Sequence, residues 1–335
     1  MLRGVLSSAS VRLALCFSLC LCAALLAAAT PLRAADDAEM RAFWMPRASL
    51  DSADGVRRAI AAAVAGGFTT VFVPVSLSSA FPTGFDGVAD AIREASSRSL
   101  RVHAWLDVNR AAGADELPGA RDHVLYQHPE WLMVPRDLAV ALMNVDTRSP
   151  EYLGRLARWT RGHLDQADAL FLSPLDPGVT PYLTERVSAL LARYAVQGVH
   201  LDTVRFPGTG FDYSRRALDV FRTEVRAGLT AAERLRMDAV EAIDPFAYPE
   251  EFPEQWNQFR QARLTALVTT LAATVRAARP DVRISAGITP DADRALREHL
   301  QDWRTWIEHR YVDALLDSPP PALPARPGSA AAGSH

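Results

Sequence analysis

The stretch VQGVHLDTVRFPGTGFDYS, from Val196 to Ser214, decides the fold, because a short apolar run ends in a carboxylate, an arginine and a Pro-Gly turn. Similar short runs recur along the chain and alternate with longer helical patterns. This alternation is typical of βαβ units around a parallel sheet. In α/β barrels the functional groups lie at the carboxyl ends of the strands. Asp202 is therefore the first candidate for a reacting group.

Six strands and six helices are predicted from the alternation. The strands are expected at 41–45, 69–75, 100–110, 282–288 and 312–317, with the opening stretch as the fourth in order. The helices are expected at 52–67, 86–98, 151–165, 182–196, 253–278 and from Ser214 onward. These units suit a doubly wound sheet or a (β/α)8 TIM-type barrel that lacks its last two units. No Gly-rich dinucleotide-binding turn follows the first strand, so we expect the α/β barrel.

The two ends of the chain differ in composition from the expected barrel domain at 35–318. Residues 1–34 have Arg3 and Arg12 before an apolar run and end in small residues, which predicts a secretory signal peptide and export to the periplasm or the extracellular space. A lipid anchor is disfavoured, since Leu precedes each Cys. No stable membrane insertion is expected after cleavage. Residues 319–335, made mostly of Pro, Ala, Gly and Ser, predict a disordered tail.

Composition excludes several classes of chemistry. All 3 Cys lie within residues 1–34 and all 36 cationic residues are Arg, so the mature chain has no thiol and no lysine amine. Thiolate nucleophiles, Cys-type zinc sites, Schiff bases and P-loops are thereby excluded. Cleavage removes three Arg and no acid, which changes the formal net charge from −3 to −6. This charge argues against a nucleic-acid partner, and no cofactor is predicted.

Polar side chains are expected on the inner faces of the third and fourth strands. Successive side chains of a strand point to opposite faces. The third strand therefore has an inner face of His103, Trp105, Asp107 and Asn109, and an apolar outer face toward the helices. The same alternation puts His200 and Asp202 inside, with Leu201 and Thr203 outside. Two strands thus direct polar groups to the same open end of the barrel, its mouth, at the carboxyl ends of the strands. His103 and His200 also suit a hydrogen-bonded core.

Aromatic residues near the predicted strand ends indicate a carbohydrate ligand. Such rings stack on the apolar faces of sugars, while Arg, Asn and Asp bind the hydroxyl groups. The candidates for this aromatic rim are Trp44, Trp105, Trp131, Phe206 and Tyr213, with Trp44 and Trp131 equally suited to packing the loops. Trp256, Trp303 and Trp306 lie on helical patterns and are expected in the core.

The chain resembles the glycoside hydrolase-like 10 family, also described as family 10 glycosyl hydrolase-like or DUF187 barrels. The matching segments are RAFWM (41–45), VHAWLDVNR (102–110), HPEWL (128–132), LDPG (175–178), GVHLDTVRFPG (198–208), FDYS (211–214), WNQFRQARLTALV (256–268) and DWRTWIEHRYVDAL (302–315). The resemblance implies a (β/α)8 fold and hydrolysis of glycosidic bonds in an envelope or extracellular polysaccharide, with denuded peptidoglycan glycan as one candidate substrate. By position, Asp202 is similar to the family's acidic residue on the fourth strand.

The sequence departs from the family pattern near its end. The family's sixth strand runs into a Pro-Met-x-Tyr segment, whereas this chain reads LLDSPPP at 315–321. The pattern also predicts no counterpart of the last two barrel units before the low-complexity tail that begins at Ser318. An open barrel exposes the edges of its outermost strands. We therefore expect that a partner or a dimer covers them, that the fold is adapted, or that the chain is a truncated product.

Glycosidases use two carboxyl groups, and Asp202 is the predicted nucleophile or base. The other carboxyl is left open between Asp107, which shares the inner face, and Asp317, Asp291 and Asp293, which lie at or beyond strand ends. The predicted substrate-binding residues are Trp44, His103, Trp105, Asn109, His200, Arg205 and Tyr213.

Two other functions remain open. One is a degenerate, truncated barrel that binds polysaccharide without cleaving it. The other is a metal-dependent hydrolase that uses His103, Asp107, His200 and Asp202 as ligands. No HxH or HExxH pair supports the second, and we predict no metal.

Overall fold

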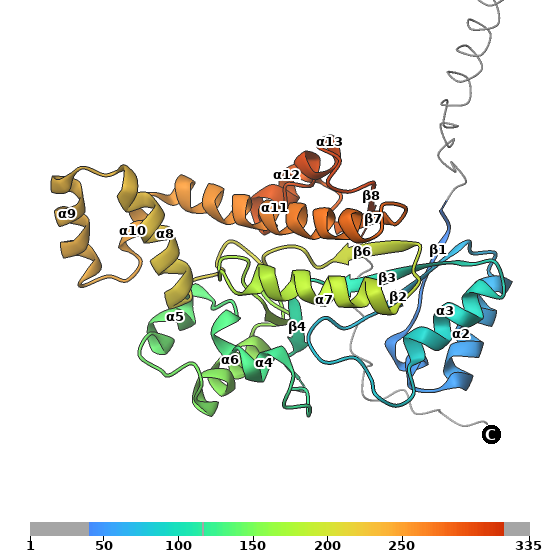
Figure 1. Ribbon diagram of the computed structural model, residues 1–335. Coiled ribbons are helices and arrows are strands. Elements are labelled where there is room, and N and C mark those ends of the chain that lie inside the picture. The colour runs from blue at the N-terminus through green and yellow to red at the C-terminus, as the bar shows by residue number, and fades with distance from the viewer. Residues whose placement is uncertain (1–39, 116, 318–335) are drawn as a thin grey trace, which may run out of the picture. The chain divides into compact units, whose positions relative to one another are not determined.

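A parallel sheet of six strands organises the part of the chain that begins at Arg41 (Figure 1). The computed structural model describes residues 40–115 and 117–317, so the predicted signal peptide and tail lie outside the described residues. The sheet has the order β1-β2-β3-β6-β7-β8. Its strands are β1 (Ala42–Trp44), β2 (Thr70–Pro74), β3 (Arg101–Asp107), β6 (Gly198–Asp202), β7 (Arg283–Ile288) and β8 (Ala314–Asp317). All six predicted strands are present in the predicted order. The sheet curls as a (β/α) barrel does but has, among the described residues, two strands fewer than a full (β/α)8 barrel.

Helices between the strands complete the barrel-type units. They are α2 (Ala53–Ala65), α3 (Gly87–Ser96), α7 (Val179–Arg193), α8 (Arg215–Gly228), α11 (Pro253–Ala278), α12 (Ala292–His299) and α13 (Trp303–Glu308). The side chains of Ser52, Asp86 and Ser214 accept hydrogen bonds from the first turns of α2, α3 and α8. Such N-caps satisfy backbone N–H groups that have no partner inside the helix. Short polar residues before each helical pattern therefore determine where these helices begin.

A long excursion separates β3 from β6. It contains β4 (Arg110–Gly113), α4 (Val124–Gln127), α5 (Arg136–Leu142), α6 (Pro150–Gly162) and β5 (Ala169–Phe171). Strands β4 and β5 form a separate antiparallel pair. The expectation of one strand over 100–110 is therefore wrong, because β3 ends at Asp107 and the chain then enters the second sheet. Beyond α8, a second insertion forms α9 (Ala231–Glu241) and α10 (Ala247–Glu251).

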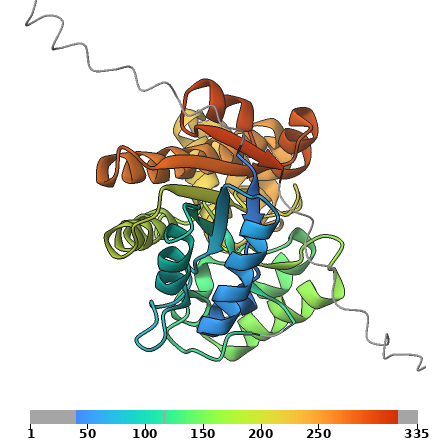
Figure 2. The same ribbon diagram turned by 90° about the vertical axis from the view of Figure 1, so that its right-hand side faces the viewer.

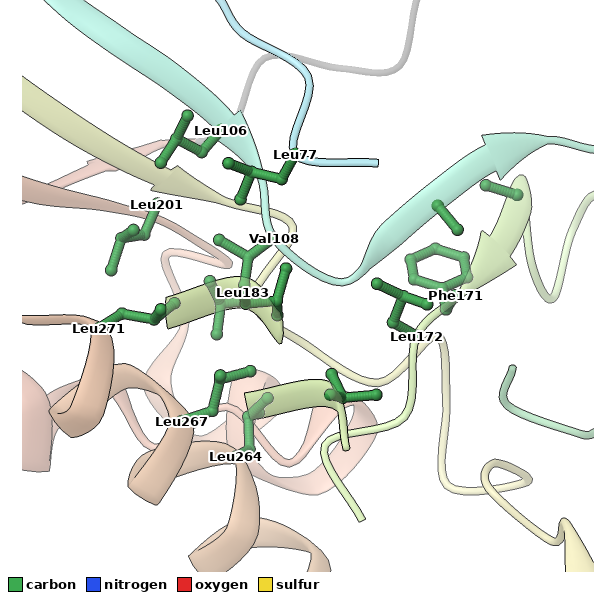
Figure 3. Packing of buried hydrophobic residues seen from close by; sticks show 14 of the residues in the cluster. Leu77, Leu106, Val108, Phe171, Leu172, Leu183, Leu201, Leu264, Leu267 and Leu271 are labelled. Carbon is green, nitrogen blue, oxygen red and sulfur yellow. The ribbon is translucent and has the colours of Figure 1, made fainter. Parts of the chain in front are cut away.

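The hydrophobic core lies between the outer face of the sheet and the helices. Figures 1 and 2 show α7 and α11 side by side along the sheet, and the two helices are in contact. Figure 3 shows Leu106 and Leu201 of the strands near Leu267 and Leu271 of α11 and Leu183 of α7. All five are fully buried. Burial of each such side chain contributes about 1.5–3 kcal/mol, so the apolar strand residues must face outward and the polar ones inward.

No helix in the described ranges is both long enough and apolar enough to cross a membrane.

Candidate active site

Two neighbouring strands bring Asp107 and Asp202 together at their carboxyl ends. Strands β3 and β6 pair in parallel, and the register sets Asp107 opposite Asp202. Neighbouring strands lie about 4.8 Å apart, and residues paired in this way point to the same face. Since Leu106 and Leu201 face the helices, the two carboxylates face the inside of the curled sheet. We call Trp105, Asp107, Asp202 and Thr203 the strand-end layer.

Asp202 is held by hydrogen bonds to both of its carboxylate oxygens. The indole Nε1 of Trp105 donates to Oδ2 at 2.8 Å, and the backbone N–H of Thr203 donates to Oδ1 at 2.7 Å. Asp202 is 6 % exposed, so only a narrow part of the residue reaches solvent. These donors fix the carboxylate in one orientation, as a catalytic group requires.

Asp107 is more exposed than Asp202 and forms an ion pair with Arg47. The Arg47 guanidinium donates to Oδ2 at 2.5 Å, and the Thr203 hydroxyl donates to Oδ1 at 2.9 Å. The Arg47 guanidinium carbon also lies 5.4 Å from the centre of the Trp105 ring. Arg47 was not predicted from the sequence as a site residue. Its position just beyond β1 was the available signal, because loops that follow parallel strands meet at the same edge of the sheet.

Thr203 corrects one expectation from the sequence. Continued alternation predicted an outward side chain, yet its hydroxyl reaches Asp107 on the inner face. The reason is that β6 ends at Asp202, and Thr203 has a φ of 55°. A positive φ breaks the strand geometry, so the alternation stops there. Thr203 thereby bridges both carboxylates, through its N–H to Asp202 and through its hydroxyl to Asp107.

Deeper inside the curled sheet lies a second layer, formed by Phe72, His103, His200 and Ser285, which we call the histidine layer. The His200 ring stacks on Phe72 with ring centres 4.9 Å apart, and its Nδ1 shares a hydrogen bond of 2.8 Å with the Ser285 hydroxyl. The other ring nitrogen, Nε2 of His200, is buried with no partner in the described structure, as is Nδ1 of His103. Burial lowers the pKa of His103 to about 4 and the pKa of His200 to about 3. Both rings are therefore neutral at pH 7.

Several predicted substrate-binding residues are buried away from the mouth. His200 and Asn109 are fully buried, and His103 is 3 % exposed. The Asn109 amide donates to the backbone carbonyl of Leu172, which follows β5. Burial therefore argues against direct contact of these three side chains with a substrate.

Asp317, a predicted candidate for the second carboxyl group, lies on the outer face of the sheet. It pairs with Ile288, whose neighbour two residues back, Ala286, is fully buried on the outer face. This register puts Asp317 outside, on the face opposite Asp202. The structure does not bring these two carboxylates together.

The half-buried aromatic residues remain near the mouth. Trp44 lies edge-on to Trp105, with ring centres 4.8 Å apart. Arg205 follows β6 and is partly exposed. Trp131, by contrast, stacks on His128 at 3.7 Å and packs against Gly178. Trp44, Trp105 and Arg205 therefore stay candidates for substrate contact, whereas Trp131 stabilises the loop.

Two buried carboxyl groups in the loops were not assigned from the sequence. Burial raises the pKa of Asp176, which lies in the loop after β5, and raises the pKa of Asp212, which lies between β6 and α8. Asp212 accepts hydrogen bonds from the backbone of Val134 and Ser214. It therefore ties the loop after β6 to the excursion. The LDPG and FDYS segments contained this signal, because each places an Asp in a loop that follows a strand.

A metal centre has no support from the geometry. Among residues 40–115 and 117–317, no three or more His, Cys, Asp or Glu side chains come together as metal ligands would. His200 and His103 instead pack against Phe72.

The chain matches the model of one known protein family. The model of the family Glycosyl hydrolase-like 10 matches residues 78–317. No match was found among the curated proteins.

Solved structures that resemble the chain include three carbohydrate-active proteins. Alpha-L-fucosidase isoenzyme 2 from Paenibacillus thiaminolyticus is 14 % identical with a TM-score of 0.45, over 74 % of this chain and 32 % of that one. The PgaB (BpsB) glycoside hydrolase domain from Bordetella bronchiseptica is 14 % identical with a TM-score of 0.49, over 82 % of this chain and 73 % of that one. An alpha-amylase from Geobacillus thermoleovorans is 13 % identical with a TM-score of 0.36, over 83 % and 49 %. The chain thus spans about a third of the fucosidase's length.

Proposed function

The chain belongs to the glycosyl hydrolase-like 10 family, and from this membership we propose that it is an exported glycoside hydrolase that cleaves a cell-envelope or extracellular polysaccharide. The observation that carries the proposal is the pairing of Asp107 and Asp202 on the inner face, at the carboxyl ends of adjacent strands. Glycosidases need two carboxyl groups beside the scissile bond. Donors already orient both groups here, which lowers the entropic cost of reaching the transition state.

The roles follow from the surroundings of each group. Asp202, oriented by Trp105 and by the Thr203 backbone, is the nucleophile or base. Asp107 is the second carboxyl by position. One residue, Thr203, reaches both Asp107 and Asp202, which favours the shorter carboxyl separation of about 5 Å and thus retention of configuration.

The substrate lies against the half-buried rings. Trp44 and Trp105 offer faces for the apolar side of a sugar, and Arg205 offers donors for its hydroxyl groups. The resemblance favours denuded peptidoglycan glycan as the polymer. Export follows from the signal-peptide pattern of residues 1–34, and the site of action is the periplasm or the extracellular space.

The proposal is tested by measuring release of reducing ends from denuded glycan strands. The wild-type chain should turn over, and Asp202→Asn should reduce turnover at least a thousandfold while the melting temperature changes little. The variant Asp107→Asn tests the role of the second carboxyl group, since loss of a general acid lowers turnover most on substrates with a poor leaving group. No release by the wild type, or equal release by Asp202→Asn, would refute hydrolysis at this site.

A binding protein without activity is the second candidate, and one observation favours it. Each oxygen of Asp202 and Asp107 already accepts a hydrogen bond, and Asp202 is only 6 % exposed. A pair so fully engaged suits a structural role as well as a catalytic one. Retention of glycan strands with no product would support this alternative.

Strands β1 and β8 form the two edges of the six-stranded sheet. Within the described residues, β1 pairs only with β2 and β8 pairs only with β7. We propose that a partner or a second copy covers this edge, as unpaired edges invite strand addition. Light scattering of the purified chain tests for a second copy.

A further inference from the structure

The loop that joins β6 to α8, residues 203–214, is held by side chains from a distant part of the chain. Arg260 of α11, His299 of α12 and Gln301, which lies between α12 and α13, all donate hydrogen bonds to its carbonyl oxygens. We call these three residues the loop clamp. They lie 49 to 97 residues after the carbonyls that they bind, so no local pattern in the sequence predicts the contacts.

Gln301 fixes the beginning of the loop. Its side chain is 1 % exposed. The amide Nε2 donates to the carbonyl oxygens of Val204 and Gly287, each at 3.1 Å, and Oε1 accepts from the backbone N–H of Thr289 at 3.0 Å. Gly287 lies in β7 and Thr289 follows it. The amide therefore ties the residue next to Thr203 to the neighbouring strand.

His299 binds the middle of the loop. Its Nδ1 lies 3.1 Å from the carbonyl oxygens of both Phe206 and Pro207. Because two acceptors face this nitrogen, it carries the proton and donates. The backbone N–H of Phe206 donates in return to the carbonyl of His299 at 3.1 Å. Burial lowers the pKa of His299, and the nearby Arg205 lowers it further, so the ring is neutral at pH 7.

Arg260 binds the far part of the loop. Its guanidinium donates to the carbonyl oxygens of Thr209, at 2.7 Å, and of Phe211. The guanidinium carbon also lies 4.7 Å from the centre of the Trp256 ring, and Arg260 is 1 % exposed. A buried cation is costly unless hydrogen bonds compensate for the lost water. The loop carbonyls supply these bonds, so the burial of Arg260 and the path of the loop depend on each other.

The loop begins at a residue with a strained backbone. Thr203 has a φ of 55°, which a β-branched residue rarely adopts. Such a conformation persists only where the surrounding structure enforces it. In this conformation the Thr203 backbone N–H donates to Asp202 and its hydroxyl donates to Asp107. Gln301 holds Val204, one residue after Thr203, and therefore helps to enforce this conformation.

We propose that Arg260, His299 and Gln301 are positioning residues, which hold Thr203 in its conformation and thereby orient Asp202. They act through the loop and not by contact with a substrate. The inference rests on the proposed function only for its effect on turnover, since the orientation of Asp202 is measured without any reaction.

The indole N–H of Trp105 reports the orientation of Asp202, because it donates to Oδ2 of that carboxylate at 2.8 Å. The indole signals of the full chain are recorded by NMR after ¹⁵N labelling, and Trp105→Phe assigns the relevant signal. His299→Leu removes a donor to the loop. It should shift this signal and make hydrogen exchange over residues 203–211 about tenfold faster. His299→Asn keeps a donor near the place of Nδ1 and should restore both properties to those of the wild type.

A second variant and a control complete the test. Gln301→Met keeps the length of the side chain, removes the donor to Val204 and should produce the same two changes. His309→Leu is the matched control, since this exposed histidine also lies at the end of a helix but its ring stacks on Tyr311. Melting temperatures verify that each variant folds. A wild-type indole signal and wild-type exchange in both His299→Leu and Gln301→Met would refute the loop clamp.

Turnover separates this inference from the proposed function. If the chain cleaves glycan strands, His299→Leu should lower kcat about tenfold and leave KM within about twofold, because the loop orients a reacting group. An unchanged kcat with faster exchange would overturn the positioning role. If the wild type releases no reducing ends, hydrolysis is contradicted, while the Trp105 signal still decides whether the loop clamp orients Asp202.

Discussion

The strand-end layer and the histidine layer occupy the same inner face of β3 and β6, yet they differ in hydrogen bonding and in depth of burial. At the strand ends, Asp107 and Asp202 accept hydrogen bonds at all four oxygens. Deeper on the same face, His103 and His200 each bury a ring nitrogen that has no partner in the described structure. The first layer retains some exposure, and the second retains almost none.

The difference shows that position along a strand decides chemistry as much as the choice of face does. Desolvation disfavours the charged form of a side chain, and its effect grows with depth. A polar residue at the mouth can keep hydrogen-bond donors and some water, whereas one in the middle of the sheet is packed by rings such as Phe72. Alternation predicts the face but carries no information on depth.

The largest expected effect is a loss of stability at low pH that originates in the histidine layer. Below pH 6.5 the unfolded chain binds protons at His103 and His200, while the folded chain does so only near pH 4 and pH 3. Stability is therefore retained above pH 6.5 and falls as the pH drops. At pH 5 each histidine costs about 2 kcal/mol, or about 4 kcal/mol together.

Urea unfolding at pH 7.5 and pH 5 measures this loss. The double variant His103→Gln/His200→Gln serves as the control, and its free energy of unfolding should depend on pH by about 4 kcal/mol less than that of the wild type. A wild-type stability that is equal at both values would show that the rings are not buried as described.

A smaller effect is expected from crowding the histidine layer. A Cβ at Gly198 would lie about 2.4 Å from three atoms of the His103 ring. Gly198→Ala should therefore lower the free energy of unfolding by about 3 kcal/mol, the upper part of the usual range for overpacking.

Gly208→Ala is the control for that substitution, because nothing lies within 4 Å of a Cβ built there. Its free energy of unfolding should stay within about 0.5 kcal/mol of the wild type. If both variants unfold at the same denaturant concentration, the contact between β3 and β6 is looser than the structure indicates.

The smallest effect on stability is expected in the strand-end layer. Thr203→Ala removes the hydroxyl that donates to Asp107 and should cost about 1 kcal/mol. Thr203→Ser keeps the hydroxyl and should cost less. If the layer is catalytic, the alanine variant lowers kcat more than it raises KM, because the hydroxyl orients a reacting group. Equal kinetics for the alanine and serine variants would remove Thr203 from the site.

Local patterns determined most of the fold. Helix α11 begins and ends at the predicted residues, Pro253 and Ala278, because a proline at the first turn and a continuous helical pattern are local signals. The pairing of β3 with β6 followed from the shared polar pattern, although the excursion between them is long. The end of β3 at Asp107 was missed, since the residues that follow join β5, a partner distant in sequence.

The candidate site was predictable only where alternation held. Asp107 and Asp202 were placed correctly on one face, since both lie inside regular strands. Thr203 was not, because its positive φ follows from the chain's path beyond the strand. Arg47 reaches Asp107 across a separation of 60 residues, which no local pattern reports.

The sequence by itself determined the class of chemistry and the face that carries it: no lysine, no cysteine beyond Cys22, and two carboxylates on the inner side of neighbouring strands. Only the tertiary structure decided which polar groups contact solvent and that Asp317 faces outward. It also decided which loops form a cavity lined by Tyr152 and Tyr213. The physical reason is that side-chain direction along a strand is set by the local backbone, whereas burial, register and loop contacts depend on residues distant in the chain.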